Sequence, residues 1–289
     1  MEYLNTMPEL PEVQTVVSQI AEKLKGKQVK GLWSDWQKRI HPSFPIFVKR
    51  VKGSHILGTR RFGKHIVIDF DNEYSIVVHL KMTGHFLIKN KTNRNSKAFT
   101  EDPVNGYIHH ILTFIDDTTL EFSDMRKFGW MQVVETRVVE DLPSIASLGV
   151  DALSERFTVS SLQKIIEKRK KKTIGEVLLE QNVIAGIGNI YRSEALFLAH
   201  ILPWRLTETL SLDEQKELVS AVKKVLRQAL RLGGMSDGDF RDTDGKEGRF
   251  QETRYVYGRA DDSCKKCGTI IVRKKLGQRS AFFCPQCQH

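Results

Sequence analysis

The sequence predicts an α+β protein: an N-terminal helix plus a two-layer antiparallel β-sandwich, then a helical domain that ends in a small β-hairpin carrying cysteines. Three patterns support this class. Apolar residues recur at helical spacing near the N-terminus, alternate at strand spacing up to about residue 134, and return to helical spacing after about residue 150. A chain of 289 residues is long enough for two domains and an appendage.

The first predicted helix starts at Pro11 and ends at Gly26, and its apolar stripe is Val13, Val16, Val17, Ile20 and Leu24. Its first turn holds a proline and carboxylates such as Glu9 and Glu12. These are favoured there because proline lacks an N–H and because the helix dipole attracts anions. Taken alone, the stretch predicts a helix that is buried along one side.

Two β-hairpins are predicted in the N-terminal half. Runs of alternating apolar and polar residues flank the polar turns Asp71-Asn72-Glu73 and Asp116-Asp117, and the polar tract Lys89–Asn105 reads as a long loop. The predicted strands are residues 66–70, 74–80, 107–115, 119–122 and 130–134.

Helices dominate the C-terminal half. They are predicted at residues 157–168, 174–182, 190–199 and 211–232. The last is the clearest, because Ser211 and Glu214 form a capping box and Gly233-Gly234 ends the helix. The predicted domains are residues 1–140, in which 1–6 is an extension, residues 150–255, and residues 256–289.

The charge balance favours a polyanionic partner, either nucleic acid or, less readily, an anionic membrane surface. The chain has 45 Lys and Arg against 35 Asp and Glu, a net charge of +10, and residues 264–289 contribute +6 with no acidic residue. No apolar run is long enough to span a membrane, and residues 1–6 lack the features of a signal peptide. We therefore expect a cytosolic protein whose cysteines are reduced or metal-bound.

Four cysteines form two pairs at a spacing typical of a metal site. Cys264 and Cys267 are separated from Cys284 and Cys287 by 16 residues, which suits two turns that each offer two thiolates to a tetrahedral Zn²⁺. Four protein ligands close the coordination shell, so we predict one structural zinc. Disulfides or free thiols are the alternative.

Two further stretches are candidates for binding phosphate. Residues 270–272 and 280–283 are predicted to form a hairpin whose loop carries Lys274, Lys275 and Arg279. The glycine-containing turn at residues 185–191 would place backbone N–H groups at a helix start, where they can hold a phosphate, although such turns more often serve close helix packing.

Six motifs follow one another along the chain: PELPEV from Pro8, Lys64 after a basic pair, HLKMTG from His79, MRKFG from Met125, AGIGNIYRSE from Ala185, and the four cysteines. In this order they resemble the bacterial formamidopyrimidine-DNA glycosylase family, also called MutM, from Met7 to the C-terminus. Each motif is weak alone, but six in family order are specific. The resemblance implies a helix–two-turn–helix element in the helical domain and a zinc finger in the hairpin. It also implies a DNA glycosylase of base excision repair that acts on damaged double-stranded DNA as a cytoplasmic monomer.

The resemblance assigns catalytic roles to five residues. Pro8 would be the nucleophile, Glu9 would move protons at the sugar, and Glu12, one helical turn later, would orient them. Lys64 would act near the lesion phosphate, and both Lys64 and Arg279 would act in the elimination steps.

The resemblance also implies seven DNA-binding residues. Met82, Arg126 and Phe128 would fill the hole that remains in the duplex when the damaged nucleotide leaves it, although Met82 and Phe128 read as core residues by pattern alone. Asn189 would contact the DNA backbone. The other contacts implied are His109, Lys172 and Tyr257.

The largest departure from the family pattern is the extension Met1–Thr6, and the chain departs at four further places. The family usually has Gly, Pro and Arg where this chain has Lys81, Met125 and Lys127, and tends to have a KHDH-like segment where it has Gly106–His109. The three hole-filling residues are intact, so the departures bear mainly on a phosphate contact near Tyr107.

The implied chemistry requires a free secondary amine at Pro8. A terminal amine titrates near pH ~8, so a neutral fraction exists at pH 7. Attack on C1′ displaces the base and leaves an iminium ion, which acts as an electron sink for loss of the 3′ and then the 5′ phosphate. Because six residues precede Met7, we expect translation from Met7 and removal of that methionine, so that the working protein begins at Pro8.

Two alternatives remain open. A blocked Pro8 would leave a non-catalytic protein that binds damaged DNA. An endonuclease VIII-like enzyme would remove oxidised pyrimidines, but that subfamily tends to open PEGPE and to lack the three hole-filling residues. Leu10, Met82, Arg126 and Phe128 therefore favour oxidised purines, namely 8-oxoguanine and formamidopyrimidines.

Overall fold

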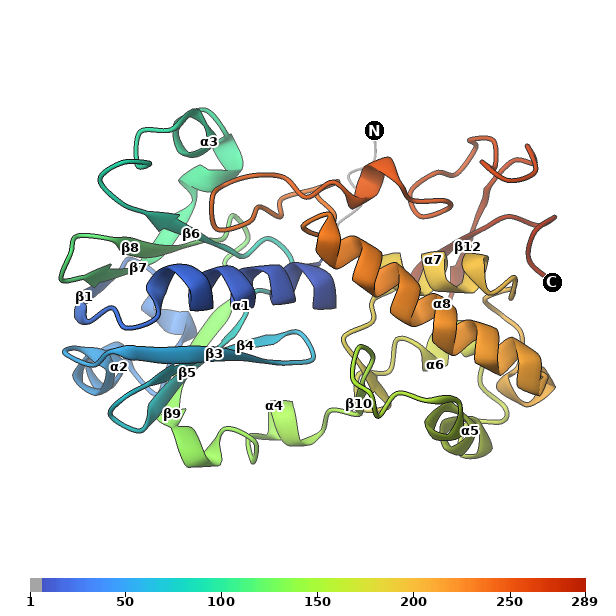
Figure 1. Cartoon of the computed structure of the whole chain (residues 1–289), viewed down its shortest axis with the longest axis horizontal. Helices are drawn as coiled ribbons and strands as arrows, with labels where there is room; N and C mark the ends of the chain where they lie inside the picture. Colours follow the sequence, from blue (N-terminus) through green and yellow to red (C-terminus); the bar gives the residue numbers. More distant parts are fainter. Residues whose placement is uncertain (1–6) are drawn as a thin grey trace. The chain divides into compact units, whose positions relative to one another are not determined.

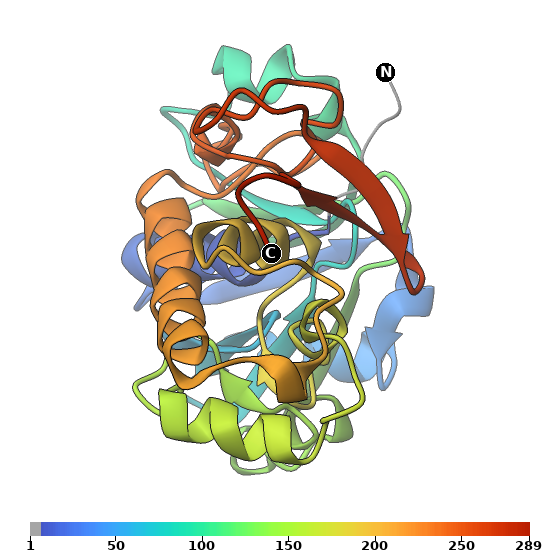
Figure 2. The ribbon, with the colours of Figure 1, turned by 90° about the vertical axis from the view of Figure 1, so that its right-hand side faces the viewer.

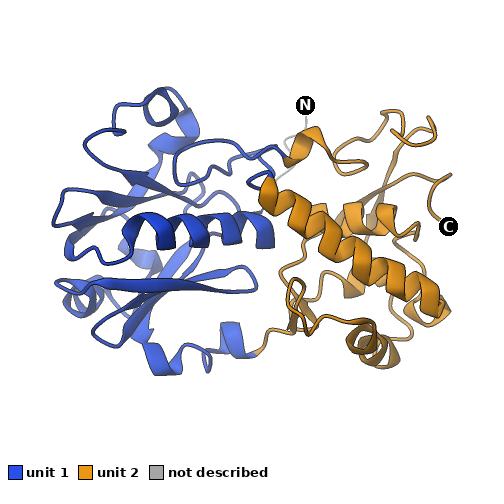
Figure 3. Ribbon diagram, viewed as in Figure 1, with its two compact units in different colours: residues 1–146, 232–249 blue, residues 147–231, 250–289 orange. Residues whose placement is uncertain are grey.

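The computed structural model describes residues 7–289, and the expectation about residues 1–6 lies outside them. The chain forms two compact units (Figure 3). Unit 1 is Met1–Ala146 with Leu232–Arg249, and unit 2 is Ser147–Arg231 with Phe250–His289. The division after Ala146 lies in the gap between the predicted domains 1–140 and 150–255. Residues 232–249 differ from the prediction because they belong to unit 1, and residues 256–289 lie in the same unit as the helices.

Unit 1 contains two sheets, which run β2-β9-β5-β4-β3 and β1-β7-β8-β6 (Figure 1). All neighbours are antiparallel except β2 and β9. The strands are β1 (Val29–Ser34), β2 (Ile40–His41), β3 (Ile56–Phe62), β4 (His65–Phe70), β5 (Tyr74–His79), β6 (His85–Lys89), β7 (Ile108–Phe114), β8 (Thr119–Ser123) and β9 (Trp130–Glu135). The helices are α1 (Leu10–Leu24), α2 (Phe44–Val51), α3 (Lys97–Thr100) and α4 (Pro143–Ala146), with short 3-10 turns at Gln37–Arg39, Pro103–Gly106 and Thr136–Val138.

The main core of unit 1 is formed by α1 and by the inner faces of both sheets. The predicted stripe of α1, from Val13 to Leu24, is buried in it. Alternation decides which strand residues join: Ile66 and Ile68 of β4 face this core, whereas Val67 faces a second cluster on the other side of the sheet. The predicted helix and sandwich are therefore confirmed.

Four strands of unit 1, namely β1, β2, β3 and β6, were not predicted from the sequence. Strand β3 illustrates the reason, because it lies at a sheet edge and carries exposed Leu57 and half-buried Arg60 and Arg61. An edge strand with solvated side chains lacks the regular alternation of apolar and polar residues by which a half-buried strand is identified.

Unit 2 is mainly helical. Its elements are β10 (Val150–Asp151), α5 (Val159–Glu167), α6 (Ile174–Val177), β11 (Ile184–Ala185), α7 (Asn189–Leu198), α8 (Leu212–Arg231), β12 (Val272–Leu276) and β13 (Arg279–Phe283), with short 3-10 turns at Thr207–Thr209 and Phe250–Glu252. The capping box predicted for α8 is present, since Ser211 and Glu214 each accept a backbone N–H from the other. No helix within residues 7–289 combines the length and apolar character of a membrane span.

The helix predicted at 174–182 is shorter in the structure, where α6 ends at Val177. Gln181 explains the early end: its side-chain amide donates to the Ile187 carbonyl, and its oxygen accepts from the Gly186 N–H. The chain after α6 is thus folded back onto the glycine turn.

The hairpin β12–β13 packs into unit 2 beside α7 (Figure 2). Phe282 contacts the Tyr257 ring, Phe283 contacts the Trp204 ring, and the Gln288 side chain donates to the Ile201 carbonyl. Both strands are longer than predicted, so Lys274 and Lys275 lie in β12 and not in the loop. The hairpin shares a core with the helices and is not a loosely attached appendage.

Candidate functional site

The start of α1 carries two buried carboxylates. Glu9 is 3% exposed and Glu12 is 1% exposed, and Pro8 beside them is also buried. Glu12 Oε2 accepts the Glu9 N–H at 2.8 Å, which is half of a reciprocal capping box. Backbone donors and the positive end of the helix dipole stabilise carboxylates at this position.

The second oxygen of Glu12 reaches a segment far along the chain. Oε1 accepts the Met235 N–H at 2.8 Å. Gly234 makes this approach possible, because its φ is +84° and a Cβ there would lie 2.6 Å from Glu12 Oε1. The Gly233-Gly234 pair that ends α8 in the sequence analysis therefore also seats the following loop on Glu12, a role that sequence reasoning missed.

Lys64 lies in the turn between β3 and β4 and is 6% exposed. The strand before it runs along α1: Thr59 donates to the Val17 carbonyl, and Arg61 Nε donates to Gln14 Oε1 at 2.8 Å. Lys64 thus belongs to the same unit as Pro8 and Glu9, on a strand that packs against α1.

A cluster of aromatic rings follows Lys64. The rings of His65 and His79 are 4.8 Å apart, and both contact Trp130. Burial lowers the pKa of His65 to about 4, and burial together with the neighbouring positive groups lowers the pKa of His79 to about 2. Both histidines are therefore neutral at pH 7, so they add no positive charge beside Lys64.

Met82, Arg126 and Phe128 come together at the surface of unit 1 from two turns, and we call them the surface triad. Arg126 Nη1 lies 3.2 Å from Met82 Sδ, and its guanidinium carbon lies 4.8 Å from the centre of the Phe128 ring. Phe128 is 41% exposed, which excludes the core role that its pattern alone suggests. An exposed apolar and cationic group of this kind is suited to insertion between bases.

His109 lies on β7 and is 8% exposed. Its Nδ1 lies 2.9 Å from Asp35 Oδ1, and its Nε2 has no hydrogen-bond partner within residues 7–289. The neighbouring Tyr107 is 41% exposed. An acceptor supplied from outside the protein, such as a phosphate oxygen, would satisfy Nε2 if the ring is protonated.

The remaining predicted DNA contacts lie in unit 2. Asn189 is the first residue of α7, after the glycine turn, and its side-chain oxygen is buried with no partner among the described residues. Lys172 lies 2.8 Å from Glu180, which also pairs with Arg169. Burial alone would raise the pKa of Glu180, but these two hydrogen bonds lower it. Tyr257 is 3% exposed, so its ring belongs to the unit 2 core.

The four cysteines converge. All four sulfur atoms lie within 4.8 Å of one another, with Cys264 and Cys287 at 3.9 Å and Cys267 and Cys284 at 3.5 Å. Tetrahedral thiolates about 2.3 Å from a zinc ion would be about 3.8 Å apart, so the geometry fits Zn²⁺. The predicted ligand set is thus confirmed. Exposed Arg279 begins β13, within the same finger.

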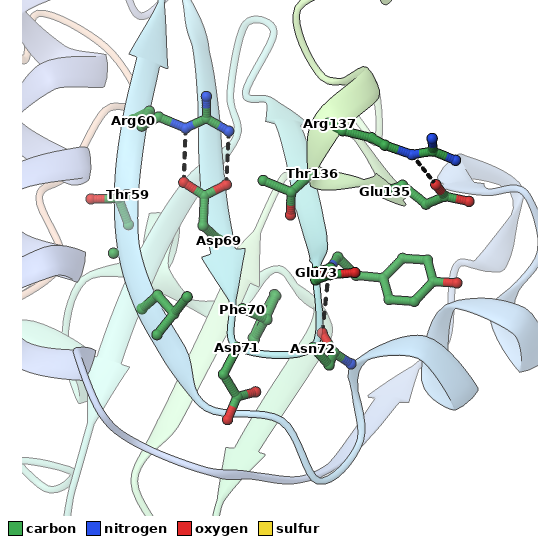
Figure 4. A pocket seen from close by; sticks show the side chains of 13 residues that line it. Thr59, Arg60, Asp69, Phe70, Asp71, Asn72, Glu73, Glu135, Thr136 and Arg137 are labelled. Atoms are coloured by element: carbon green, nitrogen blue, oxygen red, sulfur yellow. Dashed lines mark hydrogen bonds and ion pairs between the residues drawn. The ribbon is translucent and has the colours of Figure 1, made fainter.

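A separate hollow of about 810 Å³ lies on unit 1, lined by residues of β3, β4, β5 and the end of β9 (Figure 4). None of the predicted site residues lines it. Arg60 points into it and binds Asp69 through two hydrogen bonds of 2.8 and 2.9 Å, and these raise the pKa of Arg60. The basic pair before Lys64, Arg60 and Arg61, is therefore divided between two faces of β3. Arg61 binds Gln14 of α1, whereas Arg60 lies in this hollow and is paired with Asp69.

Three family models match the chain. They are the formamidopyrimidine-DNA glycosylase N-terminal domain at residues 7–131, the formamidopyrimidine-DNA glycosylase H2TH domain at 148–240, and the zinc finger found in FPG and IleRS at 263–289. Together they follow the order of the motifs.

Full-length relatives are also similar. Formamidopyrimidine-DNA glycosylase of Pelotomaculum thermopropionicum is 37% identical over 283 residues, which is 98% of this chain and 99% of the relative. The Cytobacillus firmus enzyme of the same name is 36% identical over 284 residues, 98% of this chain and 100% of the relative.

Solved structures give the same result. The Lactococcus lactis Fpg bound to abasic-site DNA has a TM-score of 0.86 at 28% identity, covering 98% of this chain and 100% of that one. The L. lactis Fpg (MutM) bound to DNA containing N7-benzyl-Fapy-dG has a TM-score of 0.86 at 29% identity, with the same coverage.

Proposed function

The chain belongs to the formamidopyrimidine-DNA glycosylase family, and on that premise we propose that it excises oxidised purines from duplex DNA and then cleaves the abasic site that remains. DNA glycosylase activity in base excision repair follows from the family. The lyase activity, the residue roles and the purine preference are the proposal. The observation that carries it is the start of α1, where Pro8 is followed by two carboxylates that are at most 3% exposed.

In the proposed reaction the Pro8 amine attacks C1′ of the damaged nucleoside, and the C1′–base bond breaks with its electron pair leaving on the base. The attacking nitrogen passes its N–H proton to the departing base and so regains its lone pair. Glu9 then supplies a proton to O4′ as the C1′–O4′ bond breaks, and the nitrogen lone pair forms the iminium with C1′. Loss of a C2′ proton sends electrons into that iminium and expels the 3′ phosphate; a second elimination expels the 5′ phosphate. The reaction requires a free amine on Pro8.

Glu12 supports this role by its position. Its two oxygens accept N–H groups from Glu9 and from Met235, so it holds the catalytic turn and the loop after α8 in fixed relation within unit 1. A nucleophile that must reach one carbon atom benefits from such preorganisation.

Lys64 is proposed to bind the phosphate next to the lesion and to assist elimination. It is 6% exposed and is followed by histidines that burial keeps neutral. A cation in poorly solvated surroundings interacts strongly with a phosphate or with developing negative charge.

DNA contacts are proposed for residues of both units. In unit 1 the surface triad would enter the duplex and His109 would meet a phosphate. In unit 2, Asn189 at the start of α7 and the basic finger would contact the backbone. Lys172 would have to leave its ion pair with Glu180 to bind a phosphate, and the ring of Tyr257 is buried. All these residues come from one chain, so we propose that a monomer acts, in the cytoplasm.

Oxidised pyrimidines are the second substrate class to test. One similar structure is the L. lactis Fpg (MutM) bound to DNA containing an oxidised pyrimidine. The surface triad favours purines as the main substrates of this chain.

The decisive experiment is borohydride trapping on duplex DNA that contains 8-oxoguanine opposite cytosine. The trapped adduct is digested, and the attached residue is identified by mass spectrometry, with the N-terminus read in the same sample. We expect attachment at Pro8 and products with phosphates at both ends. Attachment at Lys64 would overturn the nucleophile. Tight lesion binding with no adduct and no cleavage would favour the damage-binding alternative, and faster excision of oxidised pyrimidines would overturn the purine preference.

A further inference from the structure

We propose that the buried carboxylate of Asp124, together with the hydroxyl of Thr83, is the positioning pair that fixes the surface triad for insertion into DNA. The inference rests on the proposed function, because it assigns the triad its DNA-binding role. Neither residue touches the substrate in this proposal; both act through Met82, Arg126 and Phe128.

Asp124 is 1% exposed and lies directly before the turn that carries Arg126 and Phe128. One carboxylate oxygen, Oδ2, accepts the Gly129 N–H at 2.8 Å, and the other, Oδ1, accepts the Arg126 N–H at 3.2 Å. The Asp124 carbonyl also accepts the Lys127 N–H at 3.1 Å. One residue therefore holds both ends and the middle of this turn.

Thr83 connects that turn to the other one. It is 3% exposed and follows Met82 in the turn between β5 and β6. Its hydroxyl donates to Asp124 Oδ1 and accepts the Arg126 N–H at 3.1 Å. The two turns lie 41 residues apart in sequence and are locked together at this hydroxyl.

The space around the pair admits no side chain at Gly84 or Gly129. A Cβ on Gly84 would lie 2.7 Å from the Phe122 ring, and a Cβ on Gly129 would lie 2.5 Å from it. Lys81 and Lys127 adopt left-handed backbone conformations, with φ of +58° and +56°. Non-glycine residues hold this conformation only where the surroundings impose it, and here the hydrogen bonds of Asp124 and Thr83 impose it on the turn of Lys127.

The surface triad needs such support because it cannot rely on burial. Phe128 is 41% exposed, so its order depends on the backbone of its turn and on the Arg126 side chain that lies against its ring. Insertion of the surface triad between stacked bases loses binding energy if the turns that carry the triad move when the bases resist.

The test compares Thr83→Val, Thr83→Ser and Asp124→Asn with Arg126→Ala. Valine keeps the shape of threonine without the hydroxyl, and serine keeps the hydroxyl. Asparagine puts an amide N–H where Asp124 accepts an N–H. Thr113→Val on β7 is the matched control in unit 1. The first readout is the Kd for a duplex with a tetrahydrofuran abasic analogue opposite cytosine. The second is the cleavage rate of a single strand with a natural abasic site, where no partner base is orphaned.

We expect Thr83→Val and Asp124→Asn to weaken duplex binding about tenfold, the scale of one lost hydrogen bond to a charged group. Single-strand cleavage should stay within about twofold. Thr83→Ser and Thr113→Val should match the parent protein. In the Arg126→Ala background, Thr83→Val should add little, because the pair acts through the triad.

Equal losses in both readouts would mean general destabilisation and would overturn the positioning role. Duplex binding that is lost selectively in Arg126→Ala but retained in Thr83→Val would also overturn the positioning role. The proposed function of the triad would stand in that case. If Arg126→Ala itself shows no selectivity, the proposed function of the triad fails and the inference falls with it. Should Asp124→Asn not fold, the Thr83→Val and Thr83→Ser pair decides.

Discussion

Unit 1 and unit 2 hold their functional side chains by different means. In unit 2, the finger is organised by four cysteines that lie between residues 264 and 287 and converge on one zinc site. In unit 1, Glu12 joins the start of α1 to Met235, 223 residues later, and Asp124 and Thr83 join two turns. The finger depends on a metal as well as on packing against the rest of unit 2, whereas the sites of unit 1 depend on buried hydrogen bonds between distant segments. Removal of the metal should therefore affect unit 2, whereas changes in protonation or in single hydrogen bonds should affect unit 1.

The largest effect is expected from loss of the zinc. Cys284→Ser should remove the one zinc per chain and lower the free energy of unfolding of unit 2 by at least about 4 kcal/mol, because a structural metal contributes folding energy directly. The finger also supplies buried Phe282 and Phe283 to the unit 2 core, so the loss should not stay local. Metal analysis and guanidinium unfolding test this, with exposed Gln286→Ser as control. Full zinc content in Cys284→Ser would contradict it.

Acid should act on unit 1 through His65 and His79. Their pKa values are lowered on folding to about 4 and about 2, so between pH 6.5 and 4 the unfolded chain binds protons that the folded protein excludes. The free energy of unfolding is therefore unaffected by these histidines above pH 6.5 and falls as the pH decreases below it. The decrease is at most about 1.4 kcal/mol per pH unit for each histidine.

Urea unfolding at pH 7.5 and 5.5 measures this slope. His65→Gln should reduce it, whereas exposed His41→Gln should leave it unchanged. A pH-independent unfolding free energy in this range would remove the claim that unit 1 buries neutral histidines.

A smaller effect is expected for Glu12→Gln, which keeps the size of the side chain but replaces one of two accepting oxygens with an N–H donor. One of the Glu9 and Met235 N–H groups would then face a donor, at a cost of about 2 kcal/mol in the free energy of unfolding. Borohydride trapping should fall about tenfold or more, because the turn that carries Pro8 is loosened. Exposed Glu22→Gln is the control. Unchanged trapping would show that Glu12 does not position the nucleophile.

The smallest effect is expected at Lys81, whose φ is +58°. Glycine adopts this conformation without the Cβ penalty, so Lys81→Gly should raise the free energy of unfolding by up to about 1 kcal/mol, less the added entropy of the unfolded chain. Lys91→Gly, in an exposed turn, should not be stabilising. A clear loss of stability in Lys81→Gly would show that the lysine side chain makes a contact that matters more than its backbone strain.

The sequence by itself determined the elements whose signals are local. The stripe of α1 was predicted because helical spacing repeats over a few turns, and the cysteine ligands because thiolates in x2 pairs suit a tetrahedral ion. The hairpins around Asp71 and Asp116 were predicted because alternation and turn residues occur together. The motif order also identified the family that the comparisons then established.

Only the tertiary structure decided which distant residues meet. No spacing rule connects Glu12 to Met235, or Asp124 to Thr83, because such contacts depend on how sheets, turns and the returning segment 232–249 pack. The same holds for Arg60, which neighbours Arg61 in sequence but faces Asp69 because successive side chains of a strand point to opposite faces. Local periodicity can be read from the sequence, whereas the tertiary structure determines which group becomes the hydrogen-bond partner of a buried polar atom.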